Sequence, residues 1–450
     1  MRCIVCDKNE WENVDQYRIK KEGMSACKNC GFVSYPKKWK AKNEIIEYYR
    51  KSYRAAPTVD NLYSGQRKLH YHHEFLYPSV IEQWKKEGKK DPVVFDVGAA
   101  YGLSLAWLRN MRESGVHLFP QADLNGSELT LSYRRNAFHE FGLDLKEDFD
   151  DSKKYDLIMS YKVAEHMLDA DLELVRYREA LKEDGHLYIS VPTWFNRLHN
   201  FGMGGFSIEY YYSPDHVNAW TRAHFEYILK KTGFKIIKEN HAYYDSTYLC
   251  VPGDFGREVP LPTLAHIVEC LARVKKADEF CQKKELDKAL EAWPNFPLVR
   301  RAAYEYNRKE WHTKGIEEIM KQIIDPWLQL DPDSYEAFAL GGDLLMRYKK
   351  YNDALLYLQK ALQRRPKCDS ILGAIANTYR CLAEESKNDD EKAHYMTEAR
   401  TIMRYIKDNC LIAFGQATTW VYNDNASIPM PSEKTQGIRT SEPEVISKVP

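Results

Sequence analysis

A short apolar run that ends in a glycine-bearing turn constrains the fold of this chain more than any other feature. Residues 93–97 (VVFDV) lead into residues 98–102 (GAAYG), and an apolar helical pattern starts at Leu103. A continuous run of β-branched and aromatic residues predicts a parallel strand that is covered on both faces. Gly98 and Gly102 allow a sharp turn and a close approach of the backbone to a ligand. We therefore expect the strand, loop and helix of an α/β fold, a unit that binds nucleotide-like molecules.

Such a turn also occurs where packing alone requires it, so the segments that follow decide between the two interpretations. Residues 117–125 predict a second strand with an acidic residue, and residues 154–160 predict a third strand that is followed by the pair Glu165-His166. A helical pattern then ends in the turn 182–185, and residues 186–191 predict another strand. Strands that alternate with helices predict a parallel sheet with helices on its faces.

In this order the segments resemble the class I S-adenosylmethionine-dependent methyltransferases, from about residue 90 to about residue 250. The resemblance lies in an Asp-x-Gly-x-Gly-x-Gly loop, in which Ala100 replaces the middle glycine, and in the acidic residue of the second strand. It also lies in the Glu-His pair and in the Leu-Lys-x-x-Gly turn. The resemblance implies an S-adenosylmethionine site formed by Asp96, Gly98, Ala100, Gly102, Asp123 and Tyr161.

Within this site, the resemblance gives two carboxylates separate roles. Asp123 accepts hydrogen bonds from the ribose hydroxyls, because one ionised carboxylate can accept from both hydroxyls of a diol. Its distance from the turn is somewhat longer than the ~20 residues expected for such a carboxylate. Asp96 lies near the amino group of the methionine part.

Four cysteines near the N-terminus form two C-x-x-C pairs, Cys3 with Cys6 and Cys27 with Cys30. This spacing is typical of a four-cysteine zinc ribbon. Four thiolates fill a tetrahedral shell and leave no position for water, so we expect a structural Zn²⁺. Reduced cysteines without a metal are the alternative. A redox dithiol is less favoured, since no thioredoxin-like βαβ pattern surrounds the pairs.

A zinc ribbon before such a core resembles the zinc-containing sugar and natural-product methyltransferases. The resemblance implies a sugar or glycan acceptor, nucleotide-linked or part of a surface polysaccharide, methylated at oxygen or carbon. Tyr49 and Tyr53 are lid residues in this interpretation, or they pack a helix against the core. For the histidine-bearing segment 67–75 we favour a helix that faces solvent or the active site over a metal site.

Methyl transfer is an in-line displacement, so the protein must align the acceptor and take its proton. We predict His166 and His216 as catalytic residues, because imidazole titrates nearest to neutral pH. The alternative for His166 is that it only orients the junction between strand and helix. The long aromatic loop between Trp194 and Thr221 carries Tyr211 and Tyr212, which line the acceptor pocket or fill it.

The last third of the chain is charged, alanine-bearing and helical. Residues 334–366 match the ~34-residue tetratricopeptide pattern, with small residues at Gly342, Ala354 and Ala361. A single repeat cannot bury its own faces, so we expect an all-α tetratricopeptide-like solenoid, which can bind a protein partner. An ordinary helical bundle is the alternative.

The expected domains are a zinc ribbon (1–36), a helical lid or linker (37–90), the Rossmann-like methyltransferase domain (91–252), the solenoid (261–410) and a disordered tail (421–450). Lys plus Arg and Asp plus Glu each number 65, so we expect no attraction to nucleic acid. No apolar run approaches the ~20 residues of a membrane span, and we expect a cytoplasmic protein.

Two other functions stay open at this point. The enzyme could methylate a protein or a non-sugar metabolite that the helical repeats recruit. A non-catalytic scaffold with a methyltransferase fold is the other alternative, and the retained Asp96, Gly98, Gly102 and Asp123 speak against it.

Overall fold

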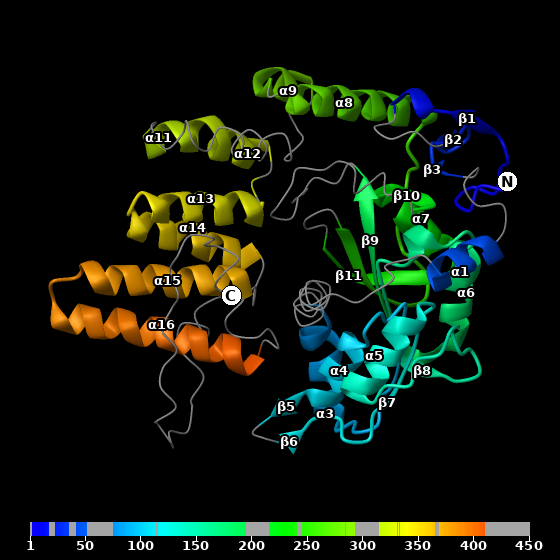
Figure 1. The fold of residues 1–450 in the computed structure, drawn as a ribbon, viewed down its shortest axis with the longest axis horizontal. Coiled ribbons are helices and arrows are strands. Elements are labelled where there is room, and N and C mark those ends of the chain that lie inside the picture. Colours follow the sequence, from blue (N-terminus) through cyan, green and yellow to red (C-terminus); the bar gives the residue numbers. More distant parts are fainter. Residues whose placement is uncertain are drawn as a thin grey trace. The chain divides into compact units, whose positions relative to one another are not determined.

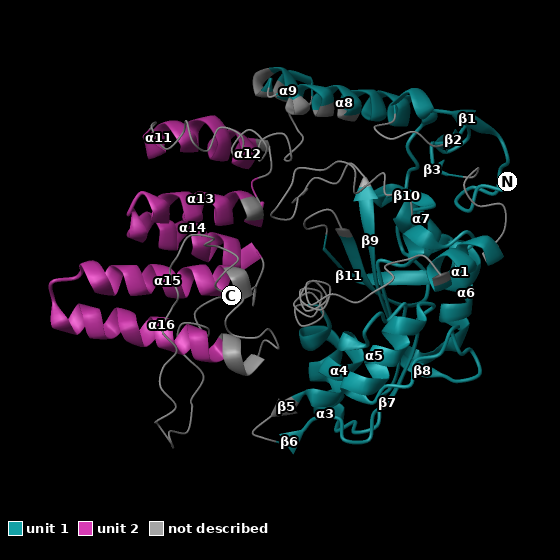
Figure 2. Ribbon diagram, in the orientation of Figure 1, with its two compact units in different colours: residues 1–306 teal, residues 307–450 magenta. Residues whose placement is uncertain are grey.

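The computed structural model describes residues 2–17, 23–35, 42–51, 75–113, 116–194, 216–240, 245–283, 285–292, 315–330, 332, 334–364 and 369–409. The chain forms two compact units, residues 1–306 and 307–450 (Figure 2). Tyr53, most of the histidine-bearing segment, the aromatic loop 195–215 and the tail 421–450 lie outside the described residues.

The centre of unit 1 is a mixed sheet of Rossmann-like type (Figure 1). Its parallel strands lie in the order β7 (Asp123–Ser127), β4 (Val93–Val97), β8 (Tyr155–Tyr161) and β9 (Leu181–Trp194). Two antiparallel strands follow, β12 (Asp245–Pro252) against β9 and β11 (Phe234–Asn240) against β12. The α/β fold expected from residues 93–102 is confirmed.

Helices cover both faces of this sheet, as continuous apolar strands require. The core on one face contains residues of α6 (Ala170–Ala180) and α7 (Arg222–Lys231). The core on the other face contains residues of α3 (Glu82–Glu87), α4 (Leu103–Asn110) and α5 (Leu131–Phe141). After a register shift that follows Tyr155, the side chains of β8 alternate between the two cores: Ile158 joins the first, and Leu157 and Met159 join the second.

A buried carboxylate fixes the beginning of the sheet. Asp156 is 2% exposed and accepts hydrogen bonds from Lys89 Nζ at 2.5 Å, Lys182 Nζ at 2.8 Å and the Val93 amide at 2.7 Å. Burial raises the pKa of Asp156, but these three donors lower it more, so its pKa lies below the ordinary 3.8. The carboxylate therefore ties the starts of β4 and β8 to the flanking lysines.

We expect Asp156→Asn to lower the free energy of unfolding by about 2 kcal/mol at neutral pH, because charged hydrogen bonds are lost in a buried place. Since the folded pKa lies below the unfolded one, this stabilisation is present above about pH 4. It disappears as the pH falls through the folded pKa, and there the two proteins should converge. Chemical denaturation at several pH values measures this. Asp151→Asn, at an exposed carboxylate, is the control and should change little. Equal stability of wild type and Asp156→Asn at neutral pH would contradict the assignment.

The N-terminal cysteine region adds three short strands to the edge of the sheet: β1 (Trp11–Asn13), β2 (Ser25–Cys27) and β3 (Val33–Ser34). Strand β3 pairs with β10 (Asn218–Thr221), and β10 also pairs with the end of β9. Phe32 packs on Trp220 with ring centroids 4.9 Å apart. The cysteine region therefore shares one hydrophobic core with the α6 and α7 face of the sheet.

Three further helices belong to unit 1: α1 (Lys42–Lys51), α8 (Leu264–Gln282) and α9 (Leu286–Ala292). Lys275 in α8 donates a hydrogen bond to the Gln16 carbonyl at 2.7 Å. A Cβ on Gly31 would lie 2.8 Å from Ile267 of α8. The helical sequence that starts near residue 261 thus packs first on the cysteine region, and the boundary between the compact units falls after residue 306.

Unit 2 is helical, as the sequence predicts for the C-terminal region. It contains α11 (Ile316–Ile319), η5 (Met320–Ile324), α12 (Asp325–Leu330), α13 (Tyr335–Arg347), α14 (Tyr351–Arg364), α15 (Asp369–Glu385) and α16 (Asp389–Asn409). A Cβ on Gly342 would lie 2.6 Å from Leu358 Cγ. The small residue of the sequence pattern therefore lets α13 and α14 approach closely.

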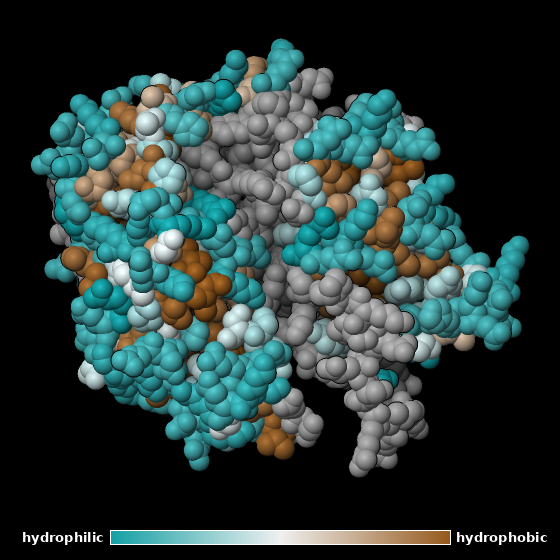
Figure 3. Space-filling model, turned by 180° about the vertical axis from the view of Figure 1, so that it is seen from behind, coloured by the Kyte–Doolittle hydropathy of each residue, from teal (hydrophilic) through white to brown (hydrophobic). Residues whose placement is uncertain are grey.

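On the face seen in Figure 3, the described residues are largely hydrophilic, with smaller brown apolar patches. Among these residues, no helix is both long enough and apolar enough to cross a membrane.

Candidate active site

The site lies at the carboxyl ends of β4, β7 and β8. Strand β4 has β7 on one side and β8 on the other, and the chain order reverses between them. In an open α/β sheet, ligands bind in the crevice outside such a switch point. The turn after β4 opens this crevice: Gly98, Ala100 and Gly102 have φ values of +63°, +52° and +72°. A Cβ on Gly98 would lie 2.7 Å from Val163 Cγ2, so the turn packs directly on the segment after β8.

Ala100 is held in a left-handed conformation that glycine adopts more easily. Lys162, directly after β8, has φ +60°. Both residues lie at the same edge of the sheet, and strained backbone of this kind clusters at functional sites. The replacement of the middle glycine by Ala100 therefore keeps the shape of the turn at a cost in stability.

We expect Ala100→Gly to raise the free energy of unfolding by about 0.5–1 kcal/mol. The left-handed conformation costs an alanine about 1–2 kcal/mol, and part of that gain is offset by the freedom of glycine in the unfolded chain. Ala99→Gly, at the buried neighbour without positive φ, is the matched control and should destabilise. Chemical denaturation measures both changes, and a destabilising Ala100→Gly would show that the methyl group is needed there.

The structure does not bring Asp123 to the turn. Asp123 begins β7 and lies opposite Val93, the first residue of β4, so it stands at the amino edge of the sheet. Its side chain is 49% exposed and binds Lys153 Nζ at 2.9 Å. The ribose role expected for Asp123 does not fit this position, because the crevice lies at the opposite, carboxyl end of β7.

Glu128 stands where Asp123 was expected. It follows Ser127, the last residue of β7. Its Oε2 accepts a hydrogen bond from the Ala100 amide at 3.0 Å, and its Oε1 accepts one from the Thr130 amide at 2.8 Å. A carboxylate thus lies directly against the glycine-bearing turn. Glu128 could be identified from the sequence only if the end of β7 were known. Asn125 and Gly126 obscure that end, because polar and small residues interrupt the apolar pattern of a strand.

Two other predicted cofactor residues lie near the same edge. Asp96 is in β4, two residues before Gly98, and is 1% exposed. Tyr161 ends β8, and Lys162 Nζ lies 5.5 Å from the centroid of its ring. Asp96 and Tyr161 therefore border the turn along two neighbouring strands.

The structure brings the two predicted catalytic histidines together. His166 ends the short helix η3 (Ala164–His166) after β8, and His216 lies two residues before β10. Their ring centroids are 4.9 Å apart. His166 Nε2 lies 3.8 Å from Oε1 of Glu165, a residue that is fully buried. The other ring nitrogen of His166, Nδ1, is hydrogen-bonded to the Tyr49 hydroxyl at 2.6 Å.

Three hydrogen bonds lock the segments that carry these histidines. The Val217 amide donates to the Glu165 carbonyl at 2.8 Å. Asn218 Nδ2 donates to the Ala164 carbonyl at 3.1 Å and to the Met167 carbonyl at 2.6 Å. The side chains of Glu165, His166 and His216 are therefore held by paired backbone rather than by a single loop.

Helix α1 links this cluster to the segment that follows Glu128. Tyr49 packs with Ile45 and Val217 in a small apolar cluster, which Leu129 and Leu168 border. Thr130 Oγ1 donates to the Tyr49 carbonyl at 3.3 Å. Tyr49 thus packs the helix against the domain and also contacts His166 of the candidate site. The two roles that the sequence leaves open, a lid residue and a packing residue, are compatible at this position.

The four N-terminal cysteines also converge. Cys3 Sγ lies 3.7 Å from Cys30 Sγ, and Cys6 Sγ lies 3.5 Å from Cys27 Sγ. All four sulfurs lie within 4.8 Å of one another. A tetrahedron with Zn–S bonds of about 2.3 Å has edges of about 3.8 Å, so this donor set fits zinc.

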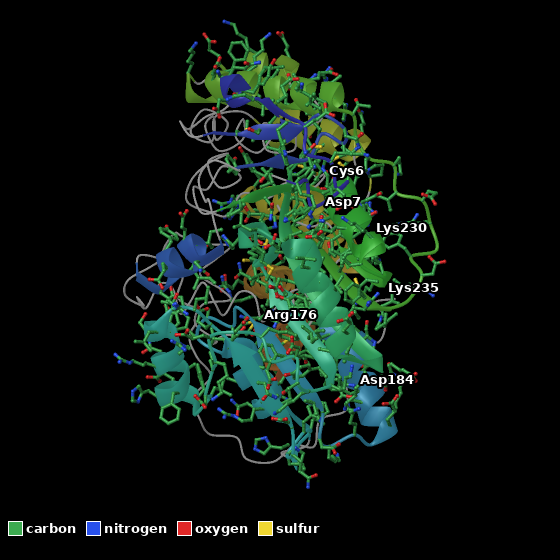
Figure 4. The ribbon with its side chains drawn as sticks, turned by 90° about the vertical axis from the view of Figure 1, so that its right-hand side faces the viewer. Cys6, Asp7, Arg176, Asp184, Lys230 and Lys235 are labelled. Carbon is green, nitrogen blue, oxygen red and sulfur yellow. The ribbon has the colours of Figure 1, made fainter. Side chains whose placement is uncertain are left out.

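The cysteine cluster is held against α7. Lys231 Nζ binds Asp7 at 2.7 Å, and Figure 4 shows Cys6 and Asp7 close to the end of α7 that carries Lys230. His224 Nε2 lies 2.7 Å from the Cys30 carbonyl, and its Nδ1 lies 2.8 Å from Thr221 Oγ1. Burial lowers the pKa of His224 to about 4, so the ring is neutral and can donate with one nitrogen and accept with the other.

Residues 69–239 match the family Methyltransf_23, described as a methyltransferase domain. No curated protein matches the chain significantly. Among solved structures, magnesium protoporphyrin IX methyltransferase from Synechocystis PCC 6803 with bound SAH is 15% identical, covers 47% of this chain and 100% of its own, and has a TM-score of 0.33. Streptomyces venezuelae DesVI is 11% identical, with 44% and 100% covered and a TM-score of 0.31.

A third similar structure is the complex of the Haloferax volcanii Trm112 methyltransferase activator with a putative methyltransferase, at 13% identity, 47% and 98% coverage and a TM-score of 0.31. These three structures identify no substrate for this chain. The family match contains the parallel strands β4, β7, β8 and β9, the turn after β4 and the segment after β8. The protein is thus an S-adenosylmethionine-dependent methyltransferase with a class I methyltransferase domain in residues 69–239.

Proposed function

We propose that this enzyme transfers the methyl group of S-adenosylmethionine to an oxygen or carbon of a sugar, nucleotide-linked or part of a surface polysaccharide. One observation carries this proposal: the turn with Glu128 and the cluster of His166, His216 and Tyr49 lie at one edge of the sheet. The turn that would bind the cofactor, the cofactor end of the site, therefore lies beside the histidine cluster that would bind the acceptor, the acceptor end. The sugar itself rests on the resemblance of the cysteine ribbon and lid helix to sugar methyltransferases.

At the cofactor end, the residues that would hold S-adenosylmethionine are Asp96, Gly98, Ala100, Gly102 and Tyr161, together with Glu128 in place of Asp123. The left-handed turn leaves room for a ligand against the backbone. The Glu128 carboxylate suits a ribose diol because it can accept from two hydroxyls. When bound, the cofactor supplies an electrophilic methyl group on a sulfonium.

At the acceptor end, we infer that His166 and His216 assist the removal of the proton from an acceptor hydroxyl or an acidic C–H group. The Tyr49 hydroxyl holds Nδ1 of His166, which directs Nε2 of the same ring toward Glu165 and His216. The hydrogen bonds from Val217 and Asn218 keep this arrangement in place without substrate. Preorganised groups of this kind reduce the reorganisation that the reaction requires.

We further propose that Cys3, Cys6, Cys27 and Cys30 bind a structural Zn²⁺, and that the helices of unit 2 form a tetratricopeptide-like solenoid. The sulfur distances support the zinc site, and the close approach at Gly342 supports the repeat. Such repeats bind peptides, so a protein partner fits unit 2. We place the enzyme in the cytoplasm, where cysteines stay reduced or metal-bound.

The test is incubation of the full-length enzyme with S-adenosylmethionine labelled in its methyl group and with panels of nucleotide sugars, glycans, proteins and small metabolites. We expect label in a carbohydrate, and we expect His216→Gln to lose that transfer while His139→Gln, an exposed histidine on α5, keeps it. Label only in a protein or non-sugar metabolite would overturn the sugar assignment. No label in any acceptor, with no cofactor binding, would favour a scaffold.

A further inference from the structure

We propose that Glu165, His166 and His216 bind a divalent metal ion beside the acceptor, at a site separate from the four cysteines. The binding of the ion stands on the geometry of these residues alone. Its role in methyl transfer rests on the proposed function and narrows it to transfer to an acceptor hydroxyl, which an ion of this kind can activate.

The donor atoms of the three side chains converge. One ligand atom from each of Glu165, His166 and His216 lies within 4.8 Å of the other two, and Nε2 of His166 lies 3.8 Å from Oε1 of Glu165. Ligands bound to one ion at about 2.0–2.2 Å lie about 3–4 Å from each other. Small side-chain rotations therefore suffice to place all three on one ion.

The surroundings match those of a metal-binding histidine. A histidine ligand usually has its second ring nitrogen fixed by a hydrogen bond, which sets the tautomer and the ring direction. Here the Tyr49 hydroxyl fixes Nδ1 of His166 at 2.6 Å and leaves Nε2 for the ion. Helix α1, which carries Tyr49, is tied to the domain by Arg50, whose guanidinium binds Glu147 at 2.7 Å.

The ligand side chains are also largely buried, and hydrogen bonds hold the segments that carry them. The side chain of Glu165 is 1% exposed, that of His166 is 16% exposed, and residue His216 is 6% exposed. The backbone bond between Val217 and Glu165 and the two bonds from Asn218 hold the ligand-bearing segments together. A carboxylate in a place of low dielectric interacts strongly with an ion of opposite charge.

The donor set also indicates which ions fit. Two imidazoles and one carboxylate suit Zn²⁺, Mn²⁺ or Fe²⁺, whereas the four thiolates of the N-terminal site select zinc. Three protein ligands leave coordination positions open, as in catalytic metal sites, whereas four cysteines leave none. The two sites therefore differ in ion preference and in access for a substrate.

An ion at this site would bind the acceptor hydroxyl and lower its pKa, so that the alkoxide forms near neutral pH. The hydroxyl proton then passes to water. The alkoxide oxygen forms a bond to the methyl carbon, the bond between sulfur and methyl breaks, and its electron pair stays on sulfur. S-adenosylhomocysteine and the methyl ether are the products, and no oxidant or reductant is needed.

The test is titration of Mn²⁺ into full-length, chelator-dialysed protein, with unbound Mn²⁺ measured by electron paramagnetic resonance. Mn²⁺ is chosen because it prefers oxygen and nitrogen ligands to thiolates. We expect about one Mn²⁺ per chain, and at least a tenfold loss of affinity in Glu165→Gln and in His216→Gln. Tyr49→Phe should lower the affinity for Mn²⁺ about tenfold, because it removes the hydroxyl that orients the His166 ring. His139→Gln is the control and should bind as wild type.

Calorimetric titration of S-adenosylmethionine shows that each variant is folded, since the cofactor residues are not changed. Absence of Mn²⁺ and Zn²⁺ binding beyond the cysteine site would overturn the inference, and so would binding that Glu165→Gln and His216→Gln leave unchanged. Methyl transfer to a sugar that persists in enzyme without an ion at this site overturns the role of the ion in methyl transfer and leaves the proposed function standing. Metal binding without transfer to any carbohydrate overturns the proposed function instead.

Discussion

Replacing Glu128 by glutamine should weaken the binding of S-adenosylmethionine by about 10- to 100-fold. A hydrogen bond to a charged acceptor contributes about 1.5–3 kcal/mol, and each 1.4 kcal/mol corresponds to a factor of ten in affinity. Glu128 lies against the turn through the Ala100 amide, so its carboxylate is the one that the ribose hydroxyls would meet. Calorimetric titration of S-adenosylmethionine and S-adenosylhomocysteine into the full-length protein measures the loss.

Asp123→Asn is the matched control for Glu128→Gln, because Asp123 begins β7, Glu128 directly follows it, and each substitution removes one negative charge. Asp123 lies at the opposite end of β7 and is paired with Lys153, so its substitution should change the affinity less than twofold. The reverse result, a loss with Asp123→Asn alone, would restore the first assignment. Equal losses in both variants would point to a long-range charge effect, which added salt would remove.

Replacing Cys27 by serine should abolish the zinc site that we propose at the four N-terminal cysteines and loosen the edge of the sheet. Structural zinc sites contribute about 10–16 kcal/mol of apparent binding free energy in small zinc domains, so one missing thiolate costs a large part of the local stability. Strand β2, which ends at Cys27, pairs with β1 and β3, and β3 pairs with β10. We expect zinc released by a thiol-blocking reagent to fall from about one per chain to near zero.

The same variant should lower the melting temperature, because Phe32 and the cysteines share a core with Trp220 and Phe225. Cys381→Ser, in unit 2, removes a cysteine that takes no part in the cluster and should retain the zinc. Full retention of zinc in Cys27→Ser, or a wild-type melting temperature after loss of zinc, would contradict a structural role for the metal.

The sequence predicts those parts of the site that local patterns encode. The β4 strand and its turn are visible because apolar residues and glycines are adjacent in the chain. Strand β7 is not visible in the same way, because Asn125 and Gly126 interrupt its apolar pattern. The sequence therefore predicts a strand that ends at residue 125 and Asp123 as its acidic residue, whereas the strand ends at Ser127 and Glu128 follows it.

Contacts between distant segments could not be predicted from local patterns. Tyr49 and His166 are 117 residues apart and meet through a hydrogen bond. The chemistry of imidazole indicates His166 and His216 separately, whereas the pairing of Val217 with Glu165 and the contact of the two rings show that they form one cluster. The merging of the cysteine region with the central sheet likewise depends on strands that lie far apart in the chain.

The pairing of β3 with β10 also sets an order of events during synthesis. Ser34 and Val217, which are joined by a hydrogen bond, are separated by 183 residues. A ribosome that adds about 5–20 residues per second needs about 10–40 s to cover that distance. Throughout this time the nascent cysteine hairpin exposes an open strand edge to other chains, a known route to aggregation. If the two C-x-x-C pairs bind a metal ion soon after they are synthesised, the hairpin would stay folded and its open edge short until β10 leaves the ribosome.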